Sequence, residues 1–301
     1  MFLGKKTTGE RIFDIFNYFL VGLITFICIA PMWYVIAASF SHPIELMRTT
    51  GMFWWPVGTP TTMGYELVFN NPNIWSGYRN TLVILAIGLS VNMFMTTLGG
   101  YVLSRKNVIF NVPLTFIIIF TMYFSGGMIP SYLLIAMNLG WLNTFWAVTI
   151  PSAISTFNLI ICRTAFAAIP DSLEESARID GANDIIILYR IVIPLSKATL
   201  AVLALFYAVG HWNSWFPALM YLRHSSLHPL QLVLRSMLIE NDLGAMGPIA
   251  EVGGGLEDLV DMARLLVRYA TIVVATVPIL FIYPFLQKYF VRGVMIGSVK
   301  G

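Results

Sequence analysis

Charged residues are scarce in this chain of 301 residues. Asp, Glu, Lys and Arg make up 11% of it, whereas soluble domains carry roughly 25%. A hydrophobic content of 57% and a mean hydropathy of +0.76 indicate a protein of the lipid bilayer. The net charge of +3 is small and the positive residues are dispersed, which argues against a nucleic-acid partner. The two cysteines, Cys28 and Cys162, lie in apolar runs, so we expect buried thiols and no disulfide.

Motifs for chemistry and for energy supply are also missing. The sequence has no G-x-x-x-x-G-K-[ST], H-E-x-x-H or G-x-S-x-G, so nothing indicates a nucleotide-binding loop, a metal site or a common hydrolase. Ion-coupled transporters usually keep ionisable residues at membrane depth. Apart from Tyr, Cys and His42, which lies near the end of the first apolar run, His211 is the only titratable residue of these runs that could do this. We therefore expect no enzyme and no ion-coupled pump, but a membrane protein that receives energy from another subunit.

The apolar runs predict the architecture. Runs without Asp, Glu, Lys or Arg cover residues 15–44, 80–104, 107–162, 198–222 and 269–287. About 20 apolar residues cross a bilayer as a helix, so four runs supply one helix each and 107–162 supplies two. A turn at residues 138–143, around Gly140, divides that longest run. We predict an all-α integral membrane protein, a single domain over 1–301, with six transmembrane helices at about 16–40, 80–104, 109–136, 143–164, 198–222 and 269–288.

The distribution of Lys and Arg predicts the orientation. With the N-terminus inside, twelve basic residues lie on the cytoplasmic side and six lie outside, which obeys the positive-inside rule. Both termini and the loop 165–197 are then cytoplasmic, and the loop 223–268 is extracytoplasmic. The first apolar run is too long for a cleaved signal peptide, so we expect an uncleaved first helix.

The loop 165–197 contains a short charged segment with helix signals. Ser172 and Glu175 have the spacing of a capping box, which would begin a helix. Gly181 is suited to end that helix in a left-handed conformation. Asn183 or Asp184 would then cap a second helix. A surface helix without any partner would show the same local features.

The order of residues in this segment adds a more specific signal. Glu175-Ser176-Ala177 is followed after three residues by Gly181, and after nine more by Ile191 and Pro194, where a helix should stop or kink. This pattern resembles the EAA signature of permease subunits of bacterial ABC importers, apart from Ser176, where Ala is commoner, and Ile193, where Leu is commoner. The resemblance implies helices that dock on a separate ATPase through Glu174, Glu175, Ser176, Ala177, Arg178, Asp180, Gly181, Ala182 and Pro194.

Three further segments, 124–134, 206–219 and 283–301, resemble carbohydrate-uptake permeases of the branch with LplC-like proteins and alginate importers. This implies the six-helix MetI-like fold of the maltose-transporter type in the bacterial cytoplasmic (inner) membrane. The implied partners are a second homologous permease, two ATPase subunits that bind ATP and Mg, and an extracytoplasmic solute-binding protein. The chain itself would hold no cofactor. The implied substrate is a large saccharide, with alginate oligosaccharide as one candidate.

Polar and aromatic side chains within the apolar runs are candidates for a sugar pathway, because sugars are recognised by aromatic faces and hydrogen-bonding groups. Hydrogen bonding between helices and anchoring at the membrane interface are the alternative explanation. For the whole chain, an ATPase-independent secondary transporter or channel, or a scaffold for an ATPase, are the alternative functions. The pathway candidates are Asn92, Thr96, Tyr123, Ser155, Asn158, Tyr207, His211, Trp212, Asn213, Ser214 and Trp215.

The two longest connections have their own signals. The first, 41–79, contains the aromatic stretch 52–56, which we interpret as an interfacial anchor. The second, 223–268, has a glycine-rich stretch at 244–255 and helical spacing of apolar residues from Glu257 onward. By resemblance the second loop would meet the solute-binding protein, although a disordered connection would fit the sequence equally.

Overall fold

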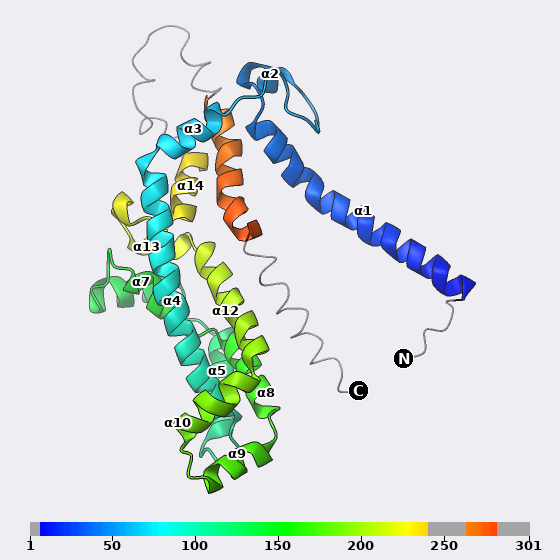
Figure 1. Ribbon diagram of the computed structural model, residues 1–301. Coiled ribbons are helices and arrows are strands. Elements are labelled where there is room, and N and C mark those ends of the chain that lie inside the picture. The colour runs from blue at the N-terminus through cyan, green and yellow to red at the C-terminus, as the bar shows by residue number, and fades with distance from the viewer. Residues whose placement is uncertain (1–6, 240–262, 282–301) are drawn as a thin grey trace. The chain divides into compact units, whose positions relative to one another are not determined.

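The computed structural model describes residues 7–239 and 263–281, and within these residues every regular element is a helix (Figure 1). The predicted all-α class is thereby confirmed. The chain divides into two compact units, residues 1–71 with 237–276, and residues 72–236 with 277–301.

The first unit contains the N-terminal helix α1 (Thr8–Ser39), which a capping box of Thr7 and Glu10 begins. Two short helices, α2 (Pro43–Arg48) and α3 (Met63–Asn70), lie in the connection that we predicted as a loop. The aromatic stretch 52–56 folds back on α1. Trp33 Nε1 donates a hydrogen bond of 2.7 Å to the carbonyl of Trp54, whose ring stacks on Phe26 at 5.5 Å. Its place at a membrane interface stays a prediction.

The helix Ala263–Phe281 contributes its first part to the same unit. Leu266 is fully buried there in a small core with Ala38 and Leu46. A Cβ on Gly64 would lie 2.9 Å from the Leu266 carbonyl oxygen, so glycine allows α3 to approach this helix. The predicted helix start at Glu257 and the stretch 244–255 lie outside the described residues.

The second unit is organised around the long helix α4 (Pro72–Ser104), which packs against α8 (Thr156–Ala167) and α12 (Lys197–Trp212). A Cβ on Gly100 would lie 2.7 Å from Cys162 Sγ, which shows how closely α4 and α8 approach. Cys162 is fully buried as expected, whereas Cys28 on α1 is not covered by other described residues, so its burial in lipid stays a prediction. The remaining helices after α8 are α9 (Asp171–Ile179), α10 (Asp184–Ile187), α11 (Ile193–Leu195), α13 (Phe216–Tyr221) and α14 (Leu230–Ile239), the last within the predicted outer loop.

Several predicted helices are interrupted. The first bend, of 107°, lies between Asn111–Tyr123 (α5) and Met128–Asn138 (α6 with a π-helical end). The second, of 48°, lies between Trp146–Ser152 (α7 with a 3-10 turn) and Thr156–Ala167. The third, of 85°, lies between Asp184–Leu195 and Lys197–Trp212. The segments predicted to cross the membrane at 109–136, 143–164 and 198–222 are thus each broken, at 124–127, 153–155 and 213–215, and their crossing of the membrane stays a prediction. By length and composition, three described helices are able to cross a membrane, or up to six if each bent pair is one crossing.

Glycine and proline explain these interruptions. Gly127 has φ +85° at the first, and Pro151, which cannot donate to a helix ladder, lies in the 3-10 turn at the second. The turn predicted at 138–143 is confirmed, because Gly140 (φ +65°) and Asn143 (φ +58°) both adopt left-handed conformations there.

Candidate functional site

The first helix of the charged loop begins differently from the prediction. Pro170 occupies the N-cap position with an extended backbone (φ −58°, ψ 132°), and no side chain caps the helix. The capping box of Ser172 and Glu175 is therefore wrong, because proline starts the helix at Asp171 and places Ser172 inside its first turn. Asp171 and Glu174 still put negative charge at the positive end of the helix dipole.

The end of this helix has the geometry that the sequence predicted. Gly181 is left-handed at φ +83°. Its N–H donates to the Arg178 carbonyl at 3.0 Å, and the Ala182 N–H donates to the Ala177 carbonyl at 2.9 Å. These two bonds form a Schellman motif, which satisfies carbonyls that the ending helix would leave unpaired. Ala177 and Ala182 also pack against the same hydrophobic core, so the motif is held from inside.

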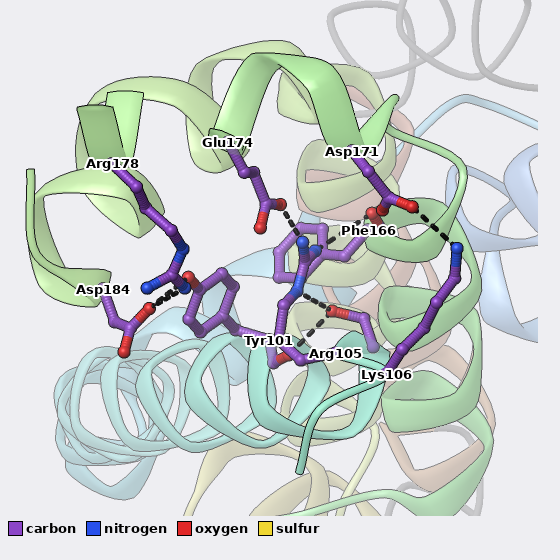
Figure 2. Close-up of polar contacts among 9 residues, drawn as sticks. Tyr101, Arg105, Lys106, Phe166, Asp171, Glu174, Arg178 and Asp184 are labelled. Carbon is purple, nitrogen blue, oxygen red and sulfur yellow. Dashed lines mark hydrogen bonds and ion pairs between the residues drawn. The ribbon is translucent and has the colours of Figure 1, made fainter. Parts of the chain in front are cut away.

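A buried ion pair joins α9 to the end of α4 (Figure 2). Arg105 Nη1 donates to Glu174 Oε1 in a close contact, and the side chains of Arg105 and Glu174 are only 10% and 9% exposed. The same guanidinium donates from Nη2 to the Phe166 carbonyl at 3.2 Å and from Nε to Ser104 Oγ at 3.0 Å. It also stacks over the Tyr101 ring at 4.8 Å. One side chain thus connects α4, α8 and α9.

Two further ion pairs, both exposed, lie near this buried one. Lys106 Nζ donates to Asp171 Oδ2 at 2.7 Å, with 85% and 60% of the two side chains exposed. This pairing lowers the pKa of the Asp171 carboxyl and raises that of the Lys106 amine. Arg178 pairs closely with Asp184, across the Gly181 turn. Such exposed pairs add little stability individually, so the buried pair is the principal polar anchor.

The loop has an inner and an outer face. Glu174 and Ala177 face the rest of the unit, while Glu175, Ser176 and Asp180 are exposed and Ile179 is 87% exposed. Ile179 therefore belongs to the outer face of α9. Figure 1 places α9 and α10 beyond the C-terminal end of α4.

The second part of the loop confirms another prediction. The Asn183 side chain accepts a hydrogen bond of 2.9 Å from the Ile186 N–H and so caps α10. The helix widens to a π-helix over Leu188–Val192 and ends at Leu195, directly after Pro194. Proline cannot donate to the ladder and crowds the preceding turn, which accounts for both the wide turn and the end of the helix.

A cavity of about 680 Å³ lies in the second unit among α6, α7, α8, α12 and α13. Five of the predicted pathway residues line this cavity. Three of them, Asn158, Tyr207 and His211, are buried, and the other two are Ser155 and Ser214. The lining mixes hydroxyl, amide and aromatic groups, and no charged side chain lines it among the described residues. Further lining residues that the sequence analysis missed are Ser125, Ser131, Phe206, Phe216 and Tyr221.

Asn92 supports this cavity from behind. Its Nδ2 donates to the carbonyls of Ser152 (2.6 Å) and Ala153 (3.0 Å), which lie where the helix pair around Pro151 is broken. A helix break leaves carbonyls without partners, and burying them unpaired would be costly. The fully buried Asn92 side chain therefore acts as the missing hydrogen-bond partner. Asn92 does not line the cavity.

The amide orientation of Asn92 determines the tautomer of His211. Since Nδ2 of Asn92 donates to two carbonyls, its Oδ1 must be the atom that accepts, and His211 Nε2 lies 2.6 Å from it. The proton of the neutral imidazole is therefore on Nε2, and Nδ1 is an acceptor. A Cβ on Gly88 would lie 2.4 Å from Nε2, so only glycine leaves room for this ring.

Tyr207 connects the same helices a turn away. Its hydroxyl lies 2.7 Å from Thr96 Oγ1 and accepts from the Ser155 N–H at 3.0 Å. Ser155 in turn caps α8 through the Asn158 N–H. The polar residues that the sequence analysis assigned to a pathway thus also perform the structural role that it named as the alternative.

Four other pathway candidates do not line this cavity. Tyr123 is 77% exposed at the end of α5, and Asn213 is exposed at the end of α12. Trp212 is buried at 6.4 Å from the Tyr78 ring. The Trp215 ring lies under the Arg235 guanidinium at 4.4 Å. For these four, contact with a substrate stays a prediction.

Comparison with known proteins agrees with this geometry. Residues 74–296 match the family model described as binding-protein-dependent transport system inner membrane component, and the chain belongs to this family. It is accordingly an inner-membrane permease subunit of an ATP-driven ABC importer and not an enzyme.

Individual relatives are similar over nearly the whole chain. The polygalacturonan/rhamnogalacturonan transport system permease protein YtcP of Bacillus subtilis (strain 168) is 41% identical over 295 residues, 97% of this chain and 99% of the relative. Protein LplC of the same organism is 42% identical over 296 residues, 98% and 97%. A chain in the crystal structure of a bacterial ABC transporter involved in the import of the acidic polysaccharide alginate has a TM-score of 0.81 at 30% identity, covering 95% of this chain and 99% of that one.

Proposed function

We propose that this permease subunit forms, with a second homologous permease, the pathway for an oligo- or polysaccharide, and that the loop 171–194 couples the pathway to two ATPase subunits. The observation that carries the coupling role is the combination of a rigid inner attachment and a free outer face on α9. Glu174 and Ala177 fasten the helix to the unit, while Glu175, Ser176, Ile179 and Asp180 are exposed. A partner that docks on the outer face would move the whole attached helix.

The saccharide is supported by the cavity and by the relatives. A volume of about 680 Å³ lies within the range of about 300–1,000 Å³ for small-molecule sites. Hydroxyl, amide and aromatic groups suit sugar rings, and Nδ1 of His211 adds an acceptor for a sugar hydroxyl. Relatives named for polygalacturonan and alginate transport favour an acidic saccharide. Because the described lining carries no cation, charge neutralisation of such a substrate would fall to the second permease.

The partners follow from the same reasoning. The ATPase subunits would bind ATP and Mg, because this sequence has no nucleotide-binding loop. An extracytoplasmic solute-binding protein would deliver the saccharide. The distribution of basic residues supports cytoplasmic termini, which would put the loop 165–197 on the same side as the ATPase subunits.

The decisive experiment is reconstitution of the chain, co-purified with its native partners, in proteoliposomes. The binding protein is added on the inside of the vesicles in one sample and on the outside in another. Uptake and ATP hydrolysis are measured with oligosaccharides of polygalacturonan, rhamnogalacturonan and alginate, and with a neutral maltooligosaccharide. We expect ATP-dependent uptake of at least one acidic oligosaccharide. Uptake that continues without ATPase subunits and stops when a proton gradient is dissipated would establish the secondary transporter instead.

A matched pair of variants tests the pathway itself. Asn158 lines the cavity, whereas Asn138, at the end of the π-helical segment Leu134–Asn138, is exposed and does not. We expect Asn158→Ala to raise the saccharide concentration needed for half-maximal uptake while ATP hydrolysis without saccharide stays the same. Asn138→Ala should leave both quantities at the level of the unmodified protein. Equal behaviour of the two variants would remove the cavity from the pathway.

A further inference from the structure

Arg105 follows directly after the last residue of α4 and lies outside the EAA pattern. Its side chain nevertheless makes several polar contacts with the coupling loop and with the helix ends around it. Its guanidinium contacts Glu174 of α9, the Phe166 carbonyl near the end of α8, and Ser104 of α4 (Figure 2). We propose that Arg105 is a positioning residue of transport, which makes α9 move as one body with the ends of α4 and α8. This inference rests on the proposed coupling function of the loop.

The chemistry of arginine suits this task. Its planar guanidinium presents donors in several fixed directions, so three separate acceptors on three segments are held at once. The side chain is only 10% exposed, and its partner Glu174 only 9%. In such surroundings water does not compete for the hydrogen bonds, and removal of one partner leaves the other charge buried without compensation. Burial lowers the pKa of the Arg105 guanidinium below its ordinary value, but arginine stays charged near neutral pH.

The neighbouring contacts stiffen the same block. Arg163 Nε of α8 donates to the Leu103 carbonyl at 2.9 Å, and Asn111 Nδ2 donates to the carbonyls of Leu103 (3.0 Å) and Arg105 (2.7 Å). The ends of α4 and α8 are therefore joined to each other independently of the loop. Arg105 is the buried residue that adds α9 to this block.

The other part of the block reaches the cavity. Asn92, about three turns before the end of α4, holds the carbonyls of Ser152 and Ala153 shortly before α8 begins. A displacement of α9 that α4 and α8 follow would consequently displace the cavity wall at 152–158. Without Arg105, α9 would be able to shift on its apolar contacts while α4 and α8 stay in place.

Four variants test the role of Arg105 in assembled, reconstituted complexes. Arg105→Met leaves Glu174 buried and unpaired. Arg105→Lys keeps the charge but cannot reach three acceptors together. Arg105→Met combined with Glu174→Leu replaces the buried pair by apolar groups, which proteins often tolerate. Lys106→Ala removes the adjacent exposed cation and is the matched control.

The measured quantity is the amount of saccharide transported per ATP hydrolysed, because a loss of folded complex lowers both rates and leaves their ratio unchanged. We expect this ratio to fall by about ten-fold for Arg105→Met, to fall less for Arg105→Lys, and to recover in the double variant. Lys106→Ala should keep the ratio of the unmodified protein. Amide hydrogen exchange of residues 171–182 should be faster in Arg105→Met.

Two results would overturn this role. One is a normal ratio with normal rates in Arg105→Met and Arg105→Lys, which would leave Arg105 without a role in transport. The other is a normal ratio with transport and hydrolysis lowered in proportion, which would make Arg105 a folding residue only. A failure of the proposed function is recognised separately, since the unmodified complex would then show no hydrolysis stimulated by saccharide at all.

Discussion

Substitution of Gly181 separates two reasons why a glycine stands at the end of the coupling helix. The residue has φ +83°, and a Cβ there would have no atom of the described chain within 4 Å. The backbone conformation is therefore demanding while the space is open. A non-glycine residue in the left-handed region costs roughly 1–2 kcal/mol, and asparagine tolerates this region better than alanine does.

The magnitude follows from the backbone alone. A cost of about 1–2 kcal/mol changes the population of the ordered loop relative to its opened forms by a factor of about 5–30. We expect Gly181→Ala to reduce saccharide-stimulated ATP hydrolysis by up to this factor, and Gly181→Asn to reduce it much less. Gly181→Trp has the backbone cost of a bulky residue and, in addition, a large side chain that would meet the ATPase in the proposed docking.

The assay is saccharide-stimulated ATP hydrolysis of the reconstituted complex, with the amount of bound ATPase subunit measured in the same samples. A larger loss in Gly181→Trp than in Gly181→Ala, with less bound ATPase, would show close docking at this position. Equal activity of the alanine and asparagine variants would refute the backbone argument. Full activity of the tryptophan variant in assembled complexes would refute the docking argument.

Two further predictions concern the cavity and the exposed ion pair. Gly88→Ala should lower transport strongly, because its Cβ would lie 2.4 Å from His211 Nε2 and displace the ring. Gly22→Ala, which has open space around its Cβ, should leave transport unchanged. Uptake assays measure both, and equal uptake by the two variants would contradict the prediction. The pairing of Lys106 with Asp171 lowers the carboxyl pKa below its ordinary 3.8 and raises the amine pKa above its ordinary 10.5. Its small stabilisation is lost only as pH falls through the lowered pKa or rises through the raised one, so Lys106→Ala should not change the pH profile of ATP hydrolysis between about pH 5 and pH 9. A profile that shifts within this window would contradict the assignment.

Local chemistry was sufficient for several features of this protein. The scarcity of charge and the apolar runs predicted a helical membrane protein, because the lack of water in the bilayer leaves helices as the simplest way to satisfy the backbone. Gly181 predicted the end of α9, and Asn183 predicted the cap of α10, since both effects depend on residues within a few positions of each other. The EAA spacing predicted the family for a similar reason.

Features that depend on distant residues needed the folded chain. Arg105 and Glu174 are 69 positions apart, and Asn92 lies 60 positions from Ser152, so no periodicity or local spacing links them. The sequence analysis accordingly assigned Asn92 to the pathway, whereas in the fold its amide pairs with carbonyls at a helix break. The capping box failed for a local reason instead, since the conformation of Pro170, two residues before Ser172, outweighed a pattern that Ser172 and Glu175 satisfied by spacing alone. Hydrophobic and turn preferences act along the chain, but buried polar groups find partners only when packing brings separate helices together.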